Sequence, residues 1–192
     1  MKLIFIRHGS TAGNLEGRYI GRTDESLCEE GIRQLRRKLD SGDYPEADVV
    51  WCSPMQRCLQ TARLIYPAAE TLTERDLREC DFGRFENKTY RELSGDGDYQ
   101  AWIDSGGTLP FPEGEDPERF RERTCRAFLK IVLSCREEDR VAFVVHGGTI
   151  MSVLSRWEEP PCGYFERRVK NGCGFECEYD RSGGKIAVLR EI

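Results

Sequence analysis

The first ten residues constrain the fold more than any other stretch of this chain. Residues 3–6 form an unbroken apolar run, Leu-Ile-Phe-Ile, that ends abruptly at Arg7-His8-Gly9. A short continuous apolar run is typical of a strand that is buried on both faces, as in a parallel sheet. In open α/β sheets, ligands bind just beyond the carboxyl ends of the strands. We therefore expect the cation of Arg7 and the imidazole of His8 to face a ligand site.

Two later apolar runs have the same form. Residues 48–52 lead into Ser53-Pro54, with Arg57 just beyond, and residues 141–145 lead into His146-Gly147-Gly148. The carboxyl ends of parallel strands meet at one edge of a sheet. We therefore expect Arg57 and His146 to reach the same place as Arg7 and His8.

Helical periodicity separates these runs. The first expected helix spans residues 27–40 and is capped by Ser26 or Asp24. Two more helices are expected to begin at Ser53-Pro54 and at Asp116-Pro117, and a fourth to span residues 149–156. Residues 175–179 and 185–189 are expected to form a hairpin. Strands that alternate with helices predict an α/β fold with a doubly wound, mostly parallel sheet and helices on both faces. The length of 192 residues fits a single domain.

Residues 84–116 do not follow this alternation. Glycine and proline interrupt only short helical pieces there, for example at Gly106-Gly107 and at Pro110 and Pro112. We interpret this segment as an excursion from the domain that roofs the site.

Composition excludes several classes of partner. The net charge is −5, so no basic excess suggests a nucleic acid. The apolar run at residues 3–6 is too short for a signal peptide core or a membrane span, so we expect a cytoplasmic protein with no membrane partner. The nine cysteines are odd in number and form no paired framework, which fits a reducing compartment. The sequence does not indicate the oligomeric state.

The strand-end residues together fit the chemistry of a phosphoryl group. The chain has only two histidines, His8 and His146, and each directly follows an expected strand. Either one alone is more often a satisfied polar residue than a catalyst. Two arginines beside them match phosphate oxygens, and the backbone amides after glycine add further donors. A neutral imidazole between arginines can serve as an in-line nucleophile, because the cations lower its pKa.

The leaving oxygen of a phosphate ester also needs a proton. Glu79 is our candidate donor and Asp81 the alternative, because alternation along residues 77–83 would place both carboxyl groups on one face. Chemistry alone does not choose between them.

These residues match four motifs of a known family, in the right order. The first motif comprises Arg7-His8-Gly9, Thr11 and Asn14, and the second comprises Ser53-Pro54, Arg57, Thr61 and Ala62. The third motif is Leu77-x-Glu79-x-x-Phe82-Gly83, and the fourth is Val145-His146-Gly147-Gly148. Over essentially its whole length, residues 1–192, the chain resembles the histidine phosphatase superfamily, the phosphoglycerate mutase-like group. Three stretches within the excursion, residues 89–93, 99–102 and 112–115, also resemble the α-ribazole phosphatases of cobalamin nucleotide-loop assembly. The same stretches occur in loosely specific phosphatases of that branch, so the resemblance does not choose between a specific and a broad phosphatase.

The resemblance implies a role for each site residue. His8 would be the catalytic nucleophile and become phosphohistidine, and Glu79 would be the proton donor. The residues that would bind the phosphoryl group are Arg7, Arg57, His146, Asn14 and the amide of Gly147. Neither a metal nor another cofactor is implied.

The expected activity is hydrolysis of a small phosphomonoester, with α-ribazole 5′-phosphate as one candidate substrate. Two alternatives stay open. One is phosphoglycerate mutase-type transfer to an organic acceptor, and the other is a non-catalytic module that binds a phosphorylated ligand.

Overall fold

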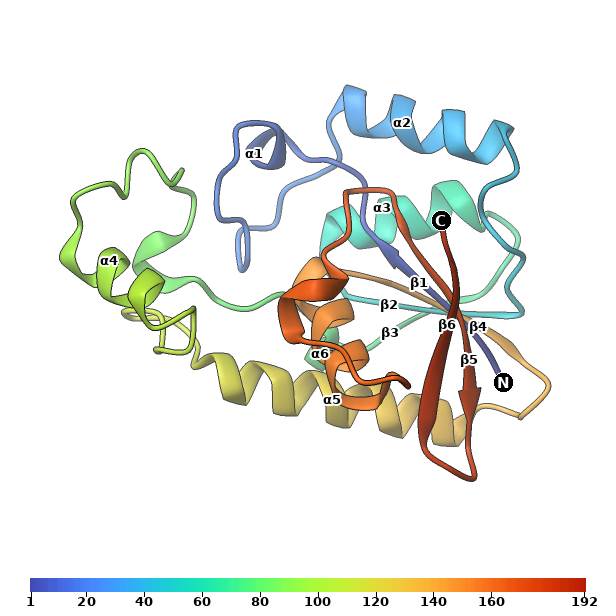
Figure 1. The fold of residues 1–192 in the computed structure, drawn as a ribbon. Coiled ribbons are helices and arrows are strands. Elements are labelled where there is room, and N and C mark those ends of the chain that lie inside the picture. Colours follow the sequence, from blue (N-terminus) through green and yellow to red (C-terminus); the bar gives the residue numbers. More distant parts are fainter.

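A six-stranded mixed sheet forms the centre of the computed structural model, which describes residues 1–192 (Figure 1). Its strands are β1 (Lys2–Arg7), β2 (Val49–Cys52), β3 (Thr71–Thr73), β4 (Arg140–Val145), β5 (Gly174–Asp180) and β6 (Lys185–Glu191), in the order β3-β2-β4-β1-β5-β6. The first four positions in that order are parallel, and β5 and β6 add an antiparallel hairpin beside β1. The expected mostly parallel sheet and its edge hairpin are confirmed.

Helices cover both faces of the sheet. They are α1 (Ala12–Leu15), α2 (Glu29–Asp40), α3 (Gln56–Ile65), α4 (Gly97–Asp104), α5 (Pro117–Ser134) and α6 (Gly147–Trp157), with the 3₁₀ turns η1 (Arg75–Leu77), η2 (Gly83–Phe85) and η3 (Tyr164–Arg167). α2 and α3 pack on one face, and α5 and α6 pack on the other (Figure 1). None of the helices combines the length and the apolar character that crossing a membrane requires.

The apolar run of β1 is buried on both faces, as its composition predicts. Leu3 and Phe5 join a cluster of 17 buried residues under α5 and α6, whereas Ile4 and Ile6 join a cluster of 12 under α2 and α3. Neighbouring residues of a strand point to opposite faces, so one run contributes to two cores.

The expected cap of the second helix was wrong. α2 begins at Glu29, and the thiol of Cys28 accepts from the amide of Gly31 at 3.4 Å. Asp24 instead accepts from the amide of Gln56 at 2.7 Å. Asp24, which was expected to cap α2, therefore pairs with a free amide at the start of α3. This hydrogen bond becomes possible only because the tertiary fold brings the two segments together.

Two helix starts also differ from expectation. α3 begins at Gln56 rather than at Ser53-Pro54. The hydroxyl of Ser53 lies 2.8 Å from Nε2 of His146 and accepts from the amide of Met55 at 3.4 Å, ahead of the first helical residue. α6 begins at Gly147, two residues before Thr149. Glycine is a poor helix former, but the amide of Gly148 donates to Glu79 at 3.3 Å, which helps to hold this first turn in place.

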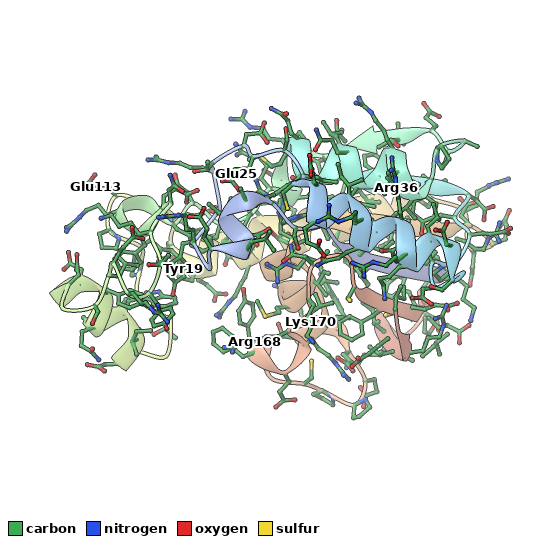
Figure 2. The ribbon with its side chains drawn as sticks, turned by 90° about the horizontal axis from the view of Figure 1, so that it is seen from above. Tyr19, Glu25, Arg36, Glu113, Arg168 and Lys170 are labelled. Atoms are coloured by element: carbon green, nitrogen blue, oxygen red, sulfur yellow. The ribbon has the colours of Figure 1, made fainter.

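Residues 84–116 lie to one side of the sheet, around α4 (Figure 1). Some of their apolar side chains join side chains from outside the segment in a third cluster, which we call the aromatic cluster. Its members and the side chains packed on it are Cys80, Phe85, Leu93, Phe111 and Phe120 with Tyr19, Phe82, Tyr99 and Trp102. Tyr19 lies where this part of the chain meets the rest of the molecule (Figure 2).

Candidate active site

The parallel pairing of β1 and β4 brings the two histidines together. Arg7 is in register with Val145, and the amide of His8 donates to the Val145 carbonyl at 2.9 Å. The two imidazoles, each one residue beyond its strand, then meet edge to face with ring centroids 5.1 Å apart. The expected convergence at the carboxyl edge of the sheet is present.

The hydrogen bond of His8 identifies its free nitrogen. Nδ1 lies 2.7 Å from the carbonyl oxygen of Gly9, and a carbonyl can only accept, so Nδ1 carries the proton. Burial, followed by the charges of Arg57 and Arg7, holds the pKa of His8 well below its usual value. The imidazole is therefore neutral, with the lone pair of Nε2 available for attack on an electrophile.

Arg57 is fully buried, although it carries a charge. It lies in the first turn of α3, where Nη1 donates to the Thr23 carbonyl at 2.7 Å and Nη2 donates to the Gly21 carbonyl at 2.8 Å. Its Nε is buried and has no hydrogen-bond partner. Arg7 shares this pattern: Nη1 donates to the Val169 carbonyl at 2.9 Å, and its Nε is buried and unpaired. Each guanidinium thus keeps a donor for an anion.

The loop that receives Arg57 needs glycine at one position. A Cβ on Gly21 would lie 1.9 Å from the carbonyl oxygen of Cys80, so no other residue permits this approach. The carboxylate of Glu86 accepts from the amides of Gly21 and Thr23 at 2.8 and 2.9 Å. Glu86 therefore ties the arginine-binding loop to the excursion, a role that no local sequence pattern indicated.

His146 is held from the side of β2. Its Nε2 and the hydroxyl of Ser53 are hydrogen bonded at 2.8 Å, and the thiol of Cys58 lies 3.6 Å from the same nitrogen. Burial and the charge of Arg57 hold the pKa of His146 well below its usual value. Both histidines are thus neutral, and the positive charge of the site resides on the arginines.

Glu79 follows β3 and η1 and reaches the start of α6. Its carboxyl oxygens accept from the amides of Cys80 at 3.0 Å and Gly148 at 3.3 Å. Burial raises the pKa of Glu79, although the two amides and the nearby arginines act in the opposite direction. A Cβ on Gly148 would lie 2.4 Å from Oε1 of Glu79, so glycine allows this contact. A buried carboxyl with a raised pKa suits a proton donor.

Asp81 has a different environment from Glu79. Its Oδ1 accepts from the amide of Gly83 at 2.9 Å, and its Oδ2 lies 3.6 Å from Nη1 of Arg22. The two carboxylates border a common polar cavity of about 310 Å³, but only Glu79 also borders the cavity that contains Arg7. The geometry thus favours Glu79 over Asp81 as the acid.

Asn14 and Gly147 lie at the margins of the site. Oδ1 of Asn14 accepts from the amide of Thr11 at 3.3 Å and from Nδ2 of Asn171 at 3.1 Å. Nδ2 of Asn171 also donates to the His8 carbonyl at 3.1 Å. Gly147 forms the first turn of α6 beside Arg7, where a Cβ would lie 3.7 Å from Nε. The sequence did not single out Asn171, which links Asn14 to His8.

A cavity of about 320 Å³ opens beside Arg7 and Glu79. Its lining combines aromatic and cationic side chains. The aromatic ones include Tyr19, Phe82, Trp102, Phe111, Tyr164 and Phe165, and the cationic ones are Arg7, Arg121 and Arg168. Arg7 and Arg168 also border a second, open groove of about 830 Å³, together with the cations Arg37, Lys38 and Lys170. Figure 2 shows Arg168 and Lys170 close together in the segment that leads to β5. No group of three or more histidine, cysteine, aspartate or glutamate side chains is placed to hold a metal ion.

Comparison with known proteins gives consistent results. The adenosylcobalamin/α-ribazole phosphatase of Escherichia coli is 27% identical over 197 residues, covering 100% of this chain and 95% of that protein. An acid phosphatase of Mycobacterium tuberculosis is 29% identical over 192 residues, covering 98% of this chain and 91% of that protein.

Two solved structures are similar in fold and sequence. The α-ribazole phosphatase of Shigella flexneri matches with a TM-score of 0.85 and 26% identity, over 99% of this chain and 95% of that one. A phosphoglycerate mutase of Thermus thermophilus matches with a TM-score of 0.75 and 28% identity, over 100% of this chain and 98% of that one. The family model of the histidine phosphatase superfamily (branch 1) matches residues 3–192, and this chain therefore belongs to that superfamily.

Proposed function

We propose that this protein hydrolyses phosphomonoesters without a metal ion, through a phosphohistidine formed on Nε2 of His8. One observation carries the proposal: two buried, neutral imidazoles lie edge to face at the ends of β1 and β4, beside two arginines that each keep a buried, unpaired Nε. The arginines supply the positive charge that a metal ion supplies in other phosphatases.

The first half-reaction transfers the phosphoryl group to the protein. Nε2 of His8 attacks phosphorus in line with the ester oxygen, the P–N bond forms, and the P–O ester bond breaks. Glu79 gives its proton to the leaving oxygen, and its raised pKa keeps that proton in place at higher pH than usual. Arg7 and Arg57 stabilise the charge on the equatorial oxygens.

The second half-reaction regenerates the enzyme. A water molecule attacks the phosphorus of the phosphohistidine, and Glu79, now a carboxylate, accepts its proton. The P–N bond breaks, so inorganic phosphate leaves and His8 is again neutral. Asn14, His146 and Gly147 complete the proposed phosphate site.

The excursion over residues 84–116 is proposed to roof the alcohol part of the substrate. Trp102 and Phe111, both from this segment, border the aromatic cavity together with Arg7 and Glu79. Aromatic side chains stack on planar rings, so the lining favours an alcohol that carries a ring. Relatives named as α-ribazole phosphatases make α-ribazole 5′-phosphate the first substrate to test.

Phosphoglycerate mutase-type transfer is the second candidate, because a similar solved structure carries that name. Phosphoglycerate is small and highly charged. Arg7, Arg121 and Arg168 border the cavity and match that charge, whereas the aromatic side chains of the same lining suit a ring-bearing alcohol better.

The test is release of inorganic phosphate in the presence of EDTA. The substrates are α-ribazole 5′-phosphate, 3-phosphoglycerate, p-nitrophenyl phosphate, and common sugar and nucleotide phosphates. We expect stoichiometric phosphate release that is insensitive to EDTA, with the highest kcat/KM for a ring-bearing substrate. Transfer of the phosphoryl group to an organic acceptor would favour the mutase, and no turnover of any substrate by folded protein would favour a binding module.

A further inference from the structure

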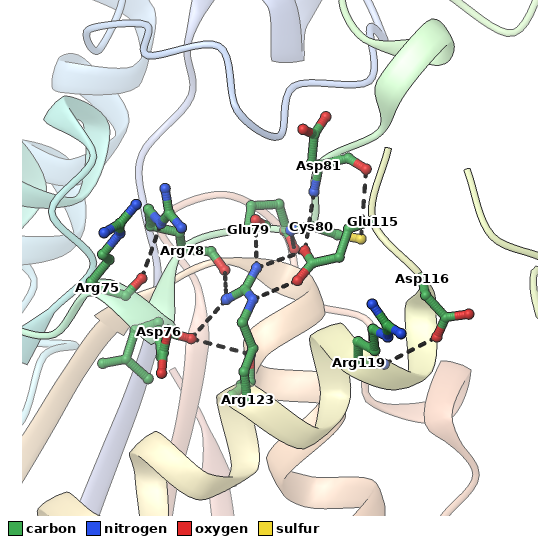
Figure 3. Close-up of polar contacts among 12 residues, drawn as sticks. Arg75, Asp76, Arg78, Glu79, Cys80, Asp81, Glu115, Asp116, Arg119 and Arg123 are labelled. Carbon is green, nitrogen blue, oxygen red and sulfur yellow. Dashed lines mark hydrogen bonds and ion pairs between the residues drawn. The ribbon is translucent and has the colours of Figure 1, made fainter. Parts of the chain in front are cut away.

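One side chain of α5 holds the segment that carries Glu79 (Figure 3). We propose that Arg123, together with Glu115, is a positioning residue that fixes the proton donor Glu79 relative to α6. This inference rests on the function proposed above, because it assigns a role within the same reaction.

The guanidinium of Arg123 uses all of its N–H groups. Nη1 donates to the carbonyls of Asp76 at 2.8 Å and Arg78 at 2.9 Å, and Nη2 donates to the carbonyl of Glu79 at 3.1 Å. Its remaining donors, on Nε and Nη2, bind the two carboxylate oxygens of Glu115 at 2.6 and 2.8 Å. This bidentate pairing with Glu115 fixes the orientation of the Arg123 guanidinium as well as its position.

Glu115 extends the contact beyond Glu79. Its Oε2 accepts from the amide of Asp81 at 3.3 Å, and its own amide donates to the Asp81 carbonyl at 2.9 Å. Arg123 and Glu115 thus hold the chain on both sides of Glu79, from Asp76 to Asp81. The two side chains are 13% and 20% exposed, so water competes little for these bonds.

The segment needs such support because regular structure does not provide it. Residues 79–82 belong to no helix or strand. The carboxyl of Glu79 must nevertheless meet the amide of Gly148 at the start of α6. α5 and α6 pack against each other, so a side chain fixed on α5 gives Glu79 a rigid reference to α6. Misplacement of a catalytic group by about 1 Å can cost about 10²-fold in rate.

The experiment compares Arg123→Lys with wild type on two esters. An alkyl phosphate has a strongly basic leaving group that needs the proton of Glu79, whereas p-nitrophenyl phosphate has a weakly basic one that needs it little. We expect Arg123→Lys to lower kcat/KM for the alkyl ester by about 10²-fold, with the loss in kcat rather than in KM, and to affect kcat/KM for p-nitrophenyl phosphate far less. The two esters are compared by kcat/KM because it reports the first half-reaction, whereas the second half-reaction, in which Glu79 is the base, is common to both. Glu115→Gln should act in the same direction more weakly.

Two further proteins separate positioning from general stability. In a Glu79→Gln background, Arg123→Lys should cause almost no further loss with the alkyl ester, because the group it positions is already absent. Arg140→Lys is the control for the loss of a bidentate arginine–carboxylate contact, since Arg140 binds Asp48 in this way, and also Glu46, on a more exposed surface at the opposite end of β4. It should leave both esters unaffected.

The results that overturn the inference are specific. Equal losses of kcat/KM on both esters, or a full additional loss in the Glu79→Gln background, would assign Arg123 a purely structural role. If Arg123→Lys does not fold, as judged by near-UV circular dichroism, the same comparison with Glu115→Gln decides. If wild-type protein hydrolyses neither ester, the proposed function itself has failed.

Discussion

The sheet with its covering helices and the aromatic cluster beside it are stabilised to different extents. The two faces of the sheet carry clusters of 17 and 12 buried residues, whereas the aromatic cluster has 5. The cluster relies instead on ring pairs, such as Phe85 and Tyr99 at 5.3 Å and Phe82 and Phe111 at 5.1 Å. Segments with less buried area open at lower free energy.

The difference fits a division of labour. His8 and His146 directly follow buried strands, and Arg57 lies in the first turn of the helix after β2, so all three are held by the sheet and its covering helices with the rigidity that phosphoryl transfer requires. The aromatic side chains that border the cavity belong mainly to the less buried part, which can adapt to the alcohol. The rate of the chemical step would then depend on the sheet, whereas the preference for one substrate over another would depend on the aromatic cluster.

The strongest test of this division removes the nucleophile. His8→Ala should lower kcat by about 10⁵-fold or more, as loss of a nucleophile does in other enzymes. The residue stands after β1 rather than within it, so the melting temperature should change by only a few degrees. Phosphate release and calorimetry measure both effects, and normal turnover by the variant would contradict the mechanism.

The next test removes charge from the same edge of the sheet. Arg57→Ala should reduce kcat by about 10²- to 10³-fold and also raise KM, because in the proposed mechanism the guanidinium binds the phosphoryl group both before and during the reaction. Arg57→Lys is the control that keeps the charge but loses the fork. A change confined to KM would mean that Arg57 makes no contact specific to the transition state.

Acid should destabilise the folded protein through the two histidines at the sheet edge. Both histidines have a lowered pKa, so below pH about 6.5 the unfolded chain binds protons that the folded chain does not. The free energy of unfolding should therefore fall by about 1.4 kcal/mol per pH unit for each histidine as the pH drops. Urea titrations at several pH values measure the slope, and a His8→Gln/His146→Gln double variant should have a shallower one.

The smallest expected effect concerns the aromatic cluster. Trp102→Ala should raise KM for a ring-bearing phosphate by about tenfold, which corresponds to about 1.4 kcal/mol of lost binding. Turnover of 3-phosphoglycerate or glycerol phosphate, if present, should change little. Leu133→Ala, at an exposed position of α5, is the control. A loss of kcat on every substrate would show that the cluster also supports the chemistry.

Much of the fold was predictable because its signals are local. The three apolar runs predicted β1, β2 and β4, and Asp116-Pro117 predicted the start of α5, where Asp116 caps the helix as expected. The edge hairpin also appeared at its expected place. These patterns depend on neighbours in the chain, so a single sequence contains them.

The candidate site was predictable for a related reason. His8, Arg57 and His146 each follow a strand, and parallel strands deliver their carboxyl ends to one edge whatever the details of packing. The catalytic roles of these residues and of Glu79 stay predictions until the variants are measured.

What the sequence could not determine are contacts between distant segments. Ser26 and Asp24 both had the chemistry of a helix cap, yet Asp24 caps α3 and a thiol, that of Cys28, caps α2. The choice depended on which amides the folded loop brought within reach.

By itself, then, the sequence determined the order of strands and helices and which side chains stand at the strand ends. The periodicity of apolar residues and the residues that end each element depend only on neighbours in the chain. Only the tertiary structure decided that Arg123 binds the carbonyl of Glu79, 44 residues away, and that Glu79 rather than Asp81 meets α6. Such hydrogen bonds form between groups that share no local pattern, and their geometry exists only once the helices have packed.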